Sequence, residues 1–241
     1  MRRGGVILVL LLLGGGLFAS AQVDEGARQG FPLVPGTEWV YRGWVRSDDG
    51  ASVIGKMTPV IWKMSVVRTV EREGVSASVV SGFPTDLDWS EGNATPALSI
   101  IVVTPDAKFY LNSEWDTQSV LDQIDNPKYP LQELAQVRDW FLQLPLAKGN
   151  KFCDEEEIRR PDDRYCWVTG APYPADLHAV KGVTPGTRTA YEVGFDTNPD
   201  DTEFEFVGGV GITSYQYHHH GTIAETELRL IEFHSASGSS R

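Results

Sequence analysis

Apolar and polar residues alternate with a period of two in several segments of this chain. Segment 38–46 shows this alternation clearly, because Trp39, Tyr41 and Val45 occupy alternate positions and share one face of an extended segment. The same spacing recurs in later segments: 60–66, 75–79, 99–104, 108–111 and 189–195. Strands with one buried and one wet face are typical of antiparallel sheets. The sequence therefore predicts a mainly β fold, a curved antiparallel sheet or a partly open barrel.

Segment 130–145 departs from this spacing. Its apolar residues follow a helical period between two prolines: Leu134, Val137, Phe141 and Leu144. A second, shorter helix is predicted over residues 117–124, with Asp116 as its cap and Asn126-Pro127 at its end. A helix with an apolar stripe must bury it, so we expect the sheet or barrel to pack on the first helix across its open face.

The first 21 residues have the pattern of a signal peptide. Arg2 and Arg3 precede the apolar run 6–13, and Ala19-Ser20-Ala21 forms a small-residue cleavage site. We therefore expect an exported protein, in the periplasm or the medium, with a flexible segment 22–30, a single β-rich domain over 31–234 and a disordered tail 235–241. No second apolar run of about 18 residues follows, which argues against an integral membrane protein.

The composition is acidic, with a formal net charge of −12 and carboxylates distributed along the whole chain. Phosphate backbones and anionic lipid surfaces would repel such a chain, so nucleic acids and membrane surfaces are disfavoured as partners. Apolar residues make up 41% of the sequence, which is enough to form a folded core.

Cys153 and Cys166 are the only cysteines. In an oxidising compartment a pair at this separation favours one structural disulfide. The alternative is a redox-active pair, but the spacing is not Cys-x-x-Cys, and the acidic run 154–157 would raise the pKa of a neighbouring thiol. The residues between the cysteines predict a hairpin with a charged tip, whose base the disulfide would link.

Two short stretches share the order apolar-Pro-Leu-x-x-Gly-x-x-aromatic. The first runs from Phe31 to Trp39, and the second from Leu144 to Phe152. Proline favours an extended entry and glycine supplies a turn before the aromatic residue opens a strand. The pair indicates either a weak internal duplication beginning near residue 144 or one turn solution used twice.

The closing segment 212–233 predicts a hairpin with three consecutive histidines near its turn. The loop is either His220-Gly221, which pairs His219 with Thr222, or Gly221-Thr222, which pairs His219 with Ala224. Both registers place the same residues on the core face: Thr213, Tyr215, Tyr217, His219, Ala224, Thr226, Leu228 and Leu230. His218 and His220 would then emerge on the wet side near Glu225.

His218, His220 and Glu225 are candidate ligands for Zn²⁺ or Cu²⁺, because His-x-His on a strand directs two imidazoles to one side. The alternatives are adventitious surface affinity for metals or a plain turn, since a wet face offers no second set of hydrogen bonds to orient the ligands. Asp196, Asn198 and Asp200 alternate as at the start of a calcium loop. Pro199 and the missing glycine instead favour an acidic turn.

The two ends of the chain resemble an uncharacterised set of exported bacterial β-rich proteins. The first motif contains Pro32, Leu33, Gly36, Trp39 and Tyr41, and the second contains Gly209, Val210, Gly211, His219, His220, Gly221, Thr222, Glu225 and Leu228. The resemblance covers about a third of the chain and implies a bacterial envelope protein with a partly open antiparallel barrel around a helix. It implies no activity and no catalytic residues.

Signatures of common enzyme classes, such as Gly-x-Ser-x-Gly, His-Glu-x-x-His or a phosphate loop, do not occur in the sequence. Our leading hypothesis is a non-enzymatic envelope protein without a cofactor, whose aromatic face binds an apolar ligand or another envelope protein. The residues predicted for that face are Trp39, Tyr41, Trp62, Tyr191, Tyr215 and Tyr217, with ordinary core packing as the alternative. The second hypothesis is a metal-binding protein or metal-dependent hydrolase that uses the 218–220 region.

Overall fold

The computed structural model describes residues 30–48, 50, 54–113, 117–137 and 139–236. The predicted signal peptide, residues 22–29 and residues 237–241 of the predicted tail lie outside the described residues. The strands of the first half are β1 (Glu38–Ser47), β2 (Lys56–Arg72), β3 (Val75–Ser81), β4 (Leu98–Val103), β5 (Lys108–Ser113) and β6 (Asp139–Gln143). Those of the second half are β7 (Lys151–Phe152), β8 (Trp167–Thr169), β9 (Tyr173–Asp176), β10 (Thr187–Asp196), β11 (Asp200–Val207), β12 (Gly211–His219) and β13 (Ala224–His234). The helices are the 3-10 helices η1 (Pro84–Leu87) and η2 (Leu131–Val137) and the α-helices α2 (Thr117–Asp125) and α3 (Glu155–Ile158).

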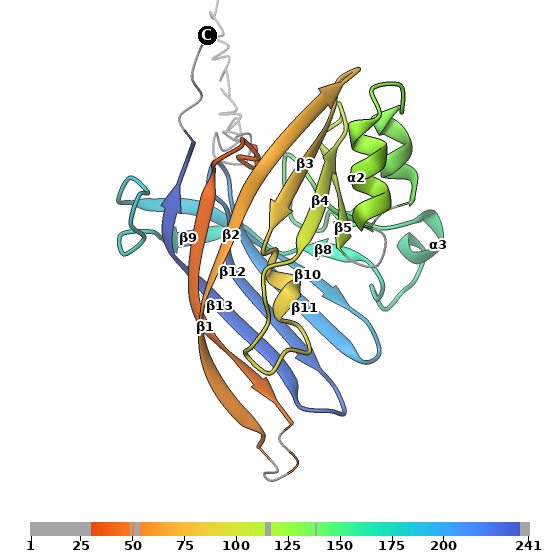
Figure 1. Cartoon of the computed structure of the whole chain (residues 1–241). Coiled ribbons are helices and arrows are strands. Elements are labelled where there is room, and N and C mark those ends of the chain that lie inside the picture. Colours follow the sequence, from red (N-terminus) through yellow and green to blue (C-terminus); the bar gives the residue numbers. More distant parts are fainter. Residues whose placement is uncertain (1–29, 49, 51–53, 114–116, 138, 237–241) are drawn as a thin grey trace, which may run out of the picture.

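The named strands form one antiparallel sheet with the order β6-β5-β4-β3-β2-β1-β13-β12-β11-β10-β8-β7, and β9 pairs with β10 (Figure 1). The sheet curves until its two end strands, β6 and β7, come close to each other. We call this junction the seam. The predicted mainly β fold, a curved antiparallel sheet or partly open barrel, is therefore confirmed, and the sheet is a nearly closed barrel.

The inner face of the sheet is filled by aromatic and aliphatic side chains that come from every part of the chain. Phe31 packs edge-on against Trp39 and Phe206, with ring centroids 5.6 and 5.8 Å apart. The Trp39 indole donates to the carbonyl oxygen of Val210 over 2.6 Å. Strands at opposite ends of the sequence are thus joined through the core as well as through the β1–β13 ladder.

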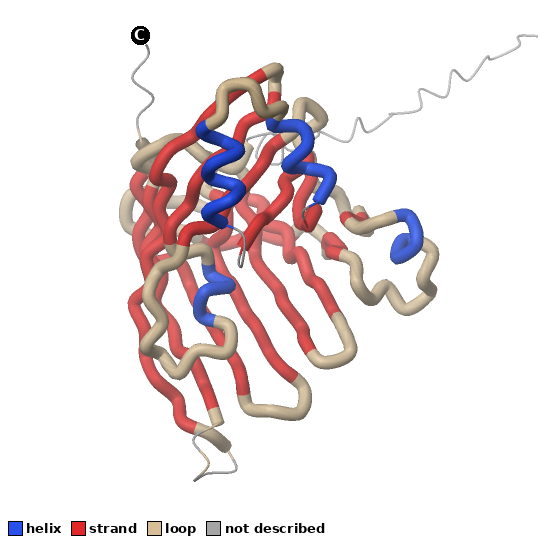
Figure 2. The backbone as a smooth tube through the Cα atoms, turned by 45° about the vertical axis from the view of Figure 1, so that its right-hand side comes forward, coloured by secondary structure: helices blue, strands red, loops and turns tan. Residues whose placement is uncertain are grey.

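Helical segments cover part of the outer face. A second apolar cluster lies between β3 and β4 on one side and α2 and η2 on the other: Val75, Ala77, Val79, Ile100, Val102, Val120, Ile124, Leu131, Leu134 and Ala135. Figure 2 shows α2 and η2 side by side over this end of the sheet. The predicted helix over 117–124 is confirmed. The helical cover, however, lies on the outer face and not on the open inner face.

The helix predicted across 130–145 is wrong in its second half. The 3-10 helix η2 ends at Val137, and strand β6 follows from Asp139 to Gln143. Phe141 and Leu142 are neighbours in sequence, and both are buried in the same core cluster. The register of the β5–β6 ladder shifts at this point, and Phe141 is the extra residue. Two consecutive buried residues interrupt the alternation that would have identified the strand, and the remaining spacing resembles that of a helix.

Cys153 and Cys166 form the predicted disulfide, with Cα atoms 4.9 Å apart. The bond joins the ends of a hairpin in which β7 pairs with β8, and α3 lies in its tip. Each of the two Pro-Leu-x-x-Gly stretches ends in a turn that precedes a strand, and Gly36 and Gly149 both have positive φ there.

Residues 83–97, which we call the covering loop, lie over the inner face of β12 and β13. Its 3-10 turn η1 lies inside the curve of the sheet in Figure 1. Asp88 accepts a hydrogen bond from the Tyr215 hydroxyl over 2.6 Å, and the Leu87 carbonyl accepts one from Thr226 over 3.2 Å. These contacts hold the loop against β12 and β13.

Candidate functional site

The six aromatic residues predicted to line a binding face are all buried, and Trp39 and Tyr41 have no exposed surface. Their polar atoms have partners within the protein. The Tyr41 hydroxyl donates to the Ile212 carbonyl over 3.0 Å, and the Trp62 indole donates to the Gly82 carbonyl over 2.8 Å. A cavity at the seam is lined by one residue of this set, Tyr215, and not by the other five.

That cavity opens at the seam and has a volume of about 920 Å³. We call it the seam pocket. Its walls come from β5 and β6 on one side, from β7, β8 and the Cys153–Cys166 hairpin on the other, and from β10–β12 and the covering loop behind. Ten of its 22 lining residues are aromatic: Phe83, Tyr110, Trp140, Phe141, Phe152, Tyr165, Trp167, Phe195, Phe204 and Tyr215.

Ring contacts across the seam fix the shape of this pocket. Trp140 of β6 meets Phe152 of β7 with ring centroids 5.6 Å apart. Trp167 of β8 lies 5.1 Å from Phe195 and 5.4 Å from Phe204, measured between centroids. Trp140, Trp167 and Phe195 are only half-buried, unlike the predicted aromatic set. These half-buried rings present the accessible aromatic surface that a ligand would contact.

The mouth of the seam pocket has more acidic than basic groups. Its charged lining residues are Lys108, Asp139, Asp154, Glu155 and Glu157. The Lys108 ammonium lies 4.6 Å from the centroid of the Trp140 ring and forms an ion pair with Asp106 over 3.2 Å. Burial raises the pKa of the Tyr110 hydroxyl, an effect that the Lys108 charge opposes and that Asp106 and Asp154 reinforce.

The closing hairpin has the second of the two predicted registers. His218 pairs with Glu225 and Tyr217 with Thr226, as expected for a Gly221-Thr222 loop. The predicted division of faces is also confirmed, because His218 is exposed and Tyr217 is buried. His219 lies on the core side, where its Nδ1 is 2.9 Å from Asp200 and its ring packs on Trp89. Asp200 thus provides the polar partner that an inward-facing histidine requires.

His218, His220 and Glu225 do come together on the outer face. The His218 and His220 rings have centroids 4.7 Å apart, and His218 Nδ1 lies 3.4 Å from a Glu225 oxygen. Two of the three also have partners outside this group, because Glu225 forms an ion pair with Arg46, and His220 lies 2.6 Å from Asp201. Among the described residues, no group of three or more histidine, cysteine, aspartate or glutamate side chains has an arrangement that could hold a metal ion.

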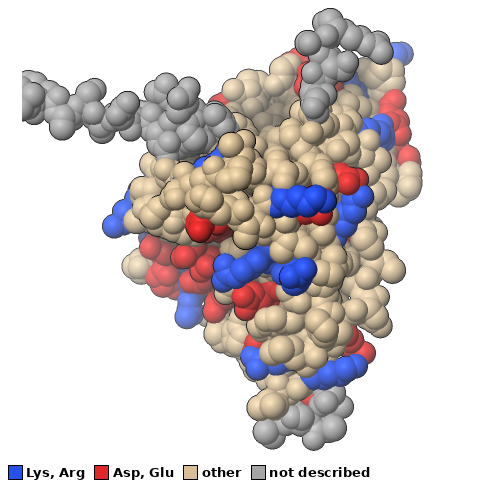
Figure 3. All heavy atoms as spheres, turned by 90° about the vertical axis from the view of Figure 1, so that its left-hand side faces the viewer, with Lys and Arg blue, Asp and Glu red and all other residues tan. Residues whose placement is uncertain are grey.

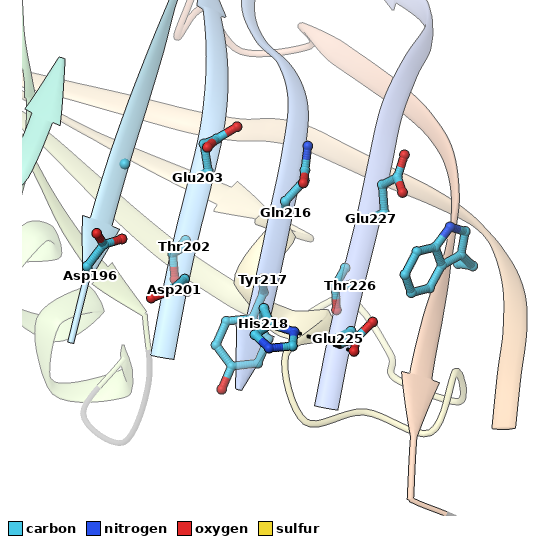
Figure 4. A pocket seen from close by; sticks show the side chains of 12 residues that line it. Asp196, Asp201, Thr202, Glu203, Gln216, Tyr217, His218, Glu225, Thr226 and Glu227 are labelled. Atoms are coloured by element: carbon cyan, nitrogen blue, oxygen red, sulfur yellow. Dashed lines mark ion pairs between the residues drawn. The ribbon is translucent and has the colours of Figure 1, made fainter. Parts of the chain in front are cut away.

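The outer face of β10–β13 has a shallow second hollow of about 420 Å³, which we call the outer hollow. Figure 4 shows its side chains in rows across neighbouring strands, and Asp196, Asp201, His218 and Glu225 form one of these rows. In the next row, burial raises the pKa of Glu203 to about 7, and the adjacent Glu192 carboxylate adds to this rise.

Figure 3 shows another side of the molecule, where acidic and basic side chains gather in adjoining groups.

The segment that resembled a calcium loop forms the turn between β10 and β11. Its three candidate ligands have separate contacts. Asn198 accepts a hydrogen bond from Arg164, Asp200 contacts His219, and Asp196 faces Asp201 across the ladder. This arrangement corresponds to the acidic turn, the favoured of the two predictions for this segment.

The sequence matches no protein-family model and shows no significant match to a curated protein. Among solved structures, it is similar to a candidate exported protein with a YmcC-like fold from Bacteroides fragilis, with 12% identity and a TM-score of 0.38 over 86% of this chain and 99% of that one. It is also similar to a candidate lipoprotein from Parabacteroides distasonis, with 10% identity and a TM-score of 0.39 over 86% and 99% of the two chains. Likeness at this level defines neither a family nor an activity. No helix within the described ranges is long and apolar enough to cross a bilayer.

Sequence reasoning did not identify the half-buried rings of the seam pocket as a site. Trp140 falls in the segment predicted as a helix, Trp167 follows the predicted hairpin, and Phe195 ends the alternating segment 189–195. Two of the strands at the pocket are also too short for alternation to reveal them: β7 has two residues and β8 has three.

Proposed function

We propose that this protein is an exported, non-enzymatic binding protein of the bacterial envelope, and that it holds an apolar small molecule in the seam pocket. The observation that carries the proposal is a cavity of about 920 Å³ in which ten of the 22 lining residues are aromatic. Ligand pockets of soluble proteins have volumes of roughly 300–1,000 Å³ and mostly apolar linings with a few polar groups.

The disulfide supports both parts of this proposal. Cys153 lines the pocket, and its bond to Cys166 fixes the β7–β8 hairpin that forms one wall. A wall held in place before the ligand arrives lowers the entropic cost of binding. The bond is also compatible with the oxidising compartment that the amino-terminal sequence predicts.

The arrangement of the lining favours binding over catalysis. Histidine, serine and free cysteine are missing from the described residues that line the seam pocket. Carboxylates and lysine can also carry protons, but those of this pocket are half-buried or exposed. The carboxylates of the pocket belong to its mouth, and the aromatic rings belong to its walls. A pocket of this kind selects its ligand by shape and apolar contact.

Titration with Nile red, a neutral apolar dye, tests the proposal directly. We expect saturable binding at one site, with the dye emission shifted as in an apolar environment. Trp167→Ala should weaken binding about tenfold, because it removes one aromatic wall. Trp44→Ala is the matched control, since Trp44 is also half-buried but faces the outer hollow. The affinity of this variant for Nile red should equal that of the wild type.

Equal affinities in the two variants would refute binding in the seam pocket. Native mass spectrometry of protein purified without an affinity tag provides an independent test, in which we expect an apolar small molecule to accompany the chain.

The alternative function, a metal-dependent role for His218, His220 and Glu225, has weaker support because each side chain already has a carboxylate or arginine partner on an exposed face. Elemental analysis of the same tag-free protein separates the two functions. We expect no stoichiometric zinc or copper. A full equivalent of either metal that disappears in His218→Ala would establish the metal function instead.

A further inference from the structure

The carboxylates that line the mouth of the seam pocket outnumber its basic groups. Three basic side chains near the mouth pair with carboxylates other than Asp154 and Glu157: Lys108 with Asp106, Arg159 with Glu155 and Arg160 with Asp162. No described residue forms an ion pair with Asp154 or Glu157. The mouth therefore retains negative charge that a ligand can meet.

Aromatic rings at the same mouth already accept cations from the protein itself. Lys108 lies over Trp140, and the Arg160 guanidinium lies 5.0 Å from the centroid of the Tyr165 ring. These two ring faces are therefore occupied, and each of the two cations also pairs with an aspartate, which leaves the charge of the mouth negative. A ligand cation would meet the carboxylates of Asp154 and Glu157.

Resting on the proposed function, we infer that the ligand of the seam pocket has an apolar body and a compact cationic group, such as a quaternary or protonated amine. The apolar body lies against Phe141, Phe195 and Phe204 inside the pocket. The cation stays at the mouth, beside the carboxylates of Asp154 and Glu157. The cationic group therefore keeps partial contact with water, which limits its desolvation cost.

Three probes with the same hydrocarbon chain separate this inference from the proposed function: octyltrimethylammonium, octanol and octyl sulfate. Calorimetric titration at low ionic strength should show that the ammonium probe binds about tenfold more tightly than octanol, and that the sulfate binds most weakly. High salt should reduce the preference for the cation while it leaves the affinity of octanol unchanged, because salt screens exposed charges.

Other orders of affinity among the three probes would contradict either the inference or the proposed function. If octanol binds as tightly as the ammonium probe, or the sulfate binds most tightly, the inference about charge is overturned and the apolar pocket stands. If none of the probes binds, and Nile red does not bind either, the proposed function itself fails.

A pair of variants tests the carboxylate contribution. Glu157→Gln should lower the affinity for the ammonium probe about threefold and leave the affinity for octanol unchanged, because Glu157 lines the mouth. Glu156→Gln is the matched control: this neighbour on α3 changes the net charge equally but is exposed and lies outside the lining. Equal losses in the two variants would show that only the overall charge matters, and would overturn the inference.

Discussion

Replacing Glu203 by glutamine is expected to stabilise the protein at neutral and alkaline pH but not at acidic pH. Glu203 lies on the outer face of β11, opposite Gly194 of β10 and Gln216 of β12. Its half-buried carboxyl has lost part of its hydration, and the Glu192 carboxylate lies beside it. Both effects disfavour the charged form in the folded protein.

The sign of the pH dependence follows from the direction of this shift. The pKa of Glu203 is about 7 in the folded protein, against an ordinary value of 4.5. Below about pH 4.5 the carboxyl is protonated in both states and has no effect. As the pH rises toward 7, the unfolded chain releases this proton before the folded protein does, so the stability of the fold falls, and above about pH 7 the full penalty applies.

The whole pKa difference corresponds to about 3 kcal/mol of stability, as an upper limit. Because solvent reaches roughly half of the side chain and screens its charge, we expect about 1 kcal/mol. Denaturant unfolding at about pH 8 should therefore show Glu203→Gln to be more stable than the wild type by that amount, and at about pH 4 the two curves should coincide.

Glu192→Gln and a distant control test the reasoning. Glu192→Gln should also stabilise the protein at about pH 8, and the double variant should gain less than the sum of the single variants, because they remove the same repulsion. Glu71→Gln, on the exposed side of β2, controls for the change in net charge. Equal gains at both pH values, or a gain in the Glu71 variant of the same size, would refute the assignment to Glu203.

Three further outcomes follow from the contacts of the fold. Replacing Cys153 and Cys166 by alanine should lower the free energy of unfolding by about 3 kcal/mol, because a loop of this length is closed in the unfolded chain, and chemical denaturation should detect the loss. Gly43→Ala should cost about 3 kcal/mol or prevent folding, since the added Cβ would lie 1.7 Å from a carbonyl oxygen of β13. Gly194→Ala, whose added Cβ would have its nearest contact at 3.9 Å, should be tolerated in the same expression and unfolding assays. Tyr217→Phe removes a hydroxyl that donates to a carboxylate of β11 over 2.5 Å, and should lower the melting temperature through a loss of about 1 kcal/mol.

Alternation alone determines which face of the closing hairpin each residue occupies. Moving the loop by one residue shifts the pairing of the two strands by two residues, and a shift by two leaves every side chain on the same face. Tyr217 and His219 therefore lie inward and His218 outward, as predicted. The register itself could not be predicted, since His220-Gly221 and Gly221-Thr222 are both acceptable loop dipeptides. The choice between them is settled by the pairing of the whole strand, in which His218 faces Glu225.

The candidate site could not be predicted in the same way, because its walls meet only through long-range packing. Trp140 and Trp167 lie on opposite sides of the seam. Local spacing shows which side chains lean inward but not which of them remain uncovered. That outcome depends on the covering loop, whose irregular sequence has no periodicity to reveal where it packs, although Asp88 and Leu87 join it to the inner face.

The geometry of the seam also favours a small ligand over an added peptide strand. Sheet edges attract extended chains when they are long, flat and uncharged. Here the edge strand β6 has five residues and β7 has two, and the acidic turn α3 follows β7 directly. No ladder joins β6 to β7 within the described part of the sheet, and the Trp140–Phe152 ring contact bridges them instead. Such a contact contributes about 1 kcal/mol. A ligand that inserts between the two rings therefore breaks only a weak contact, and it forms new contacts with both aromatic surfaces.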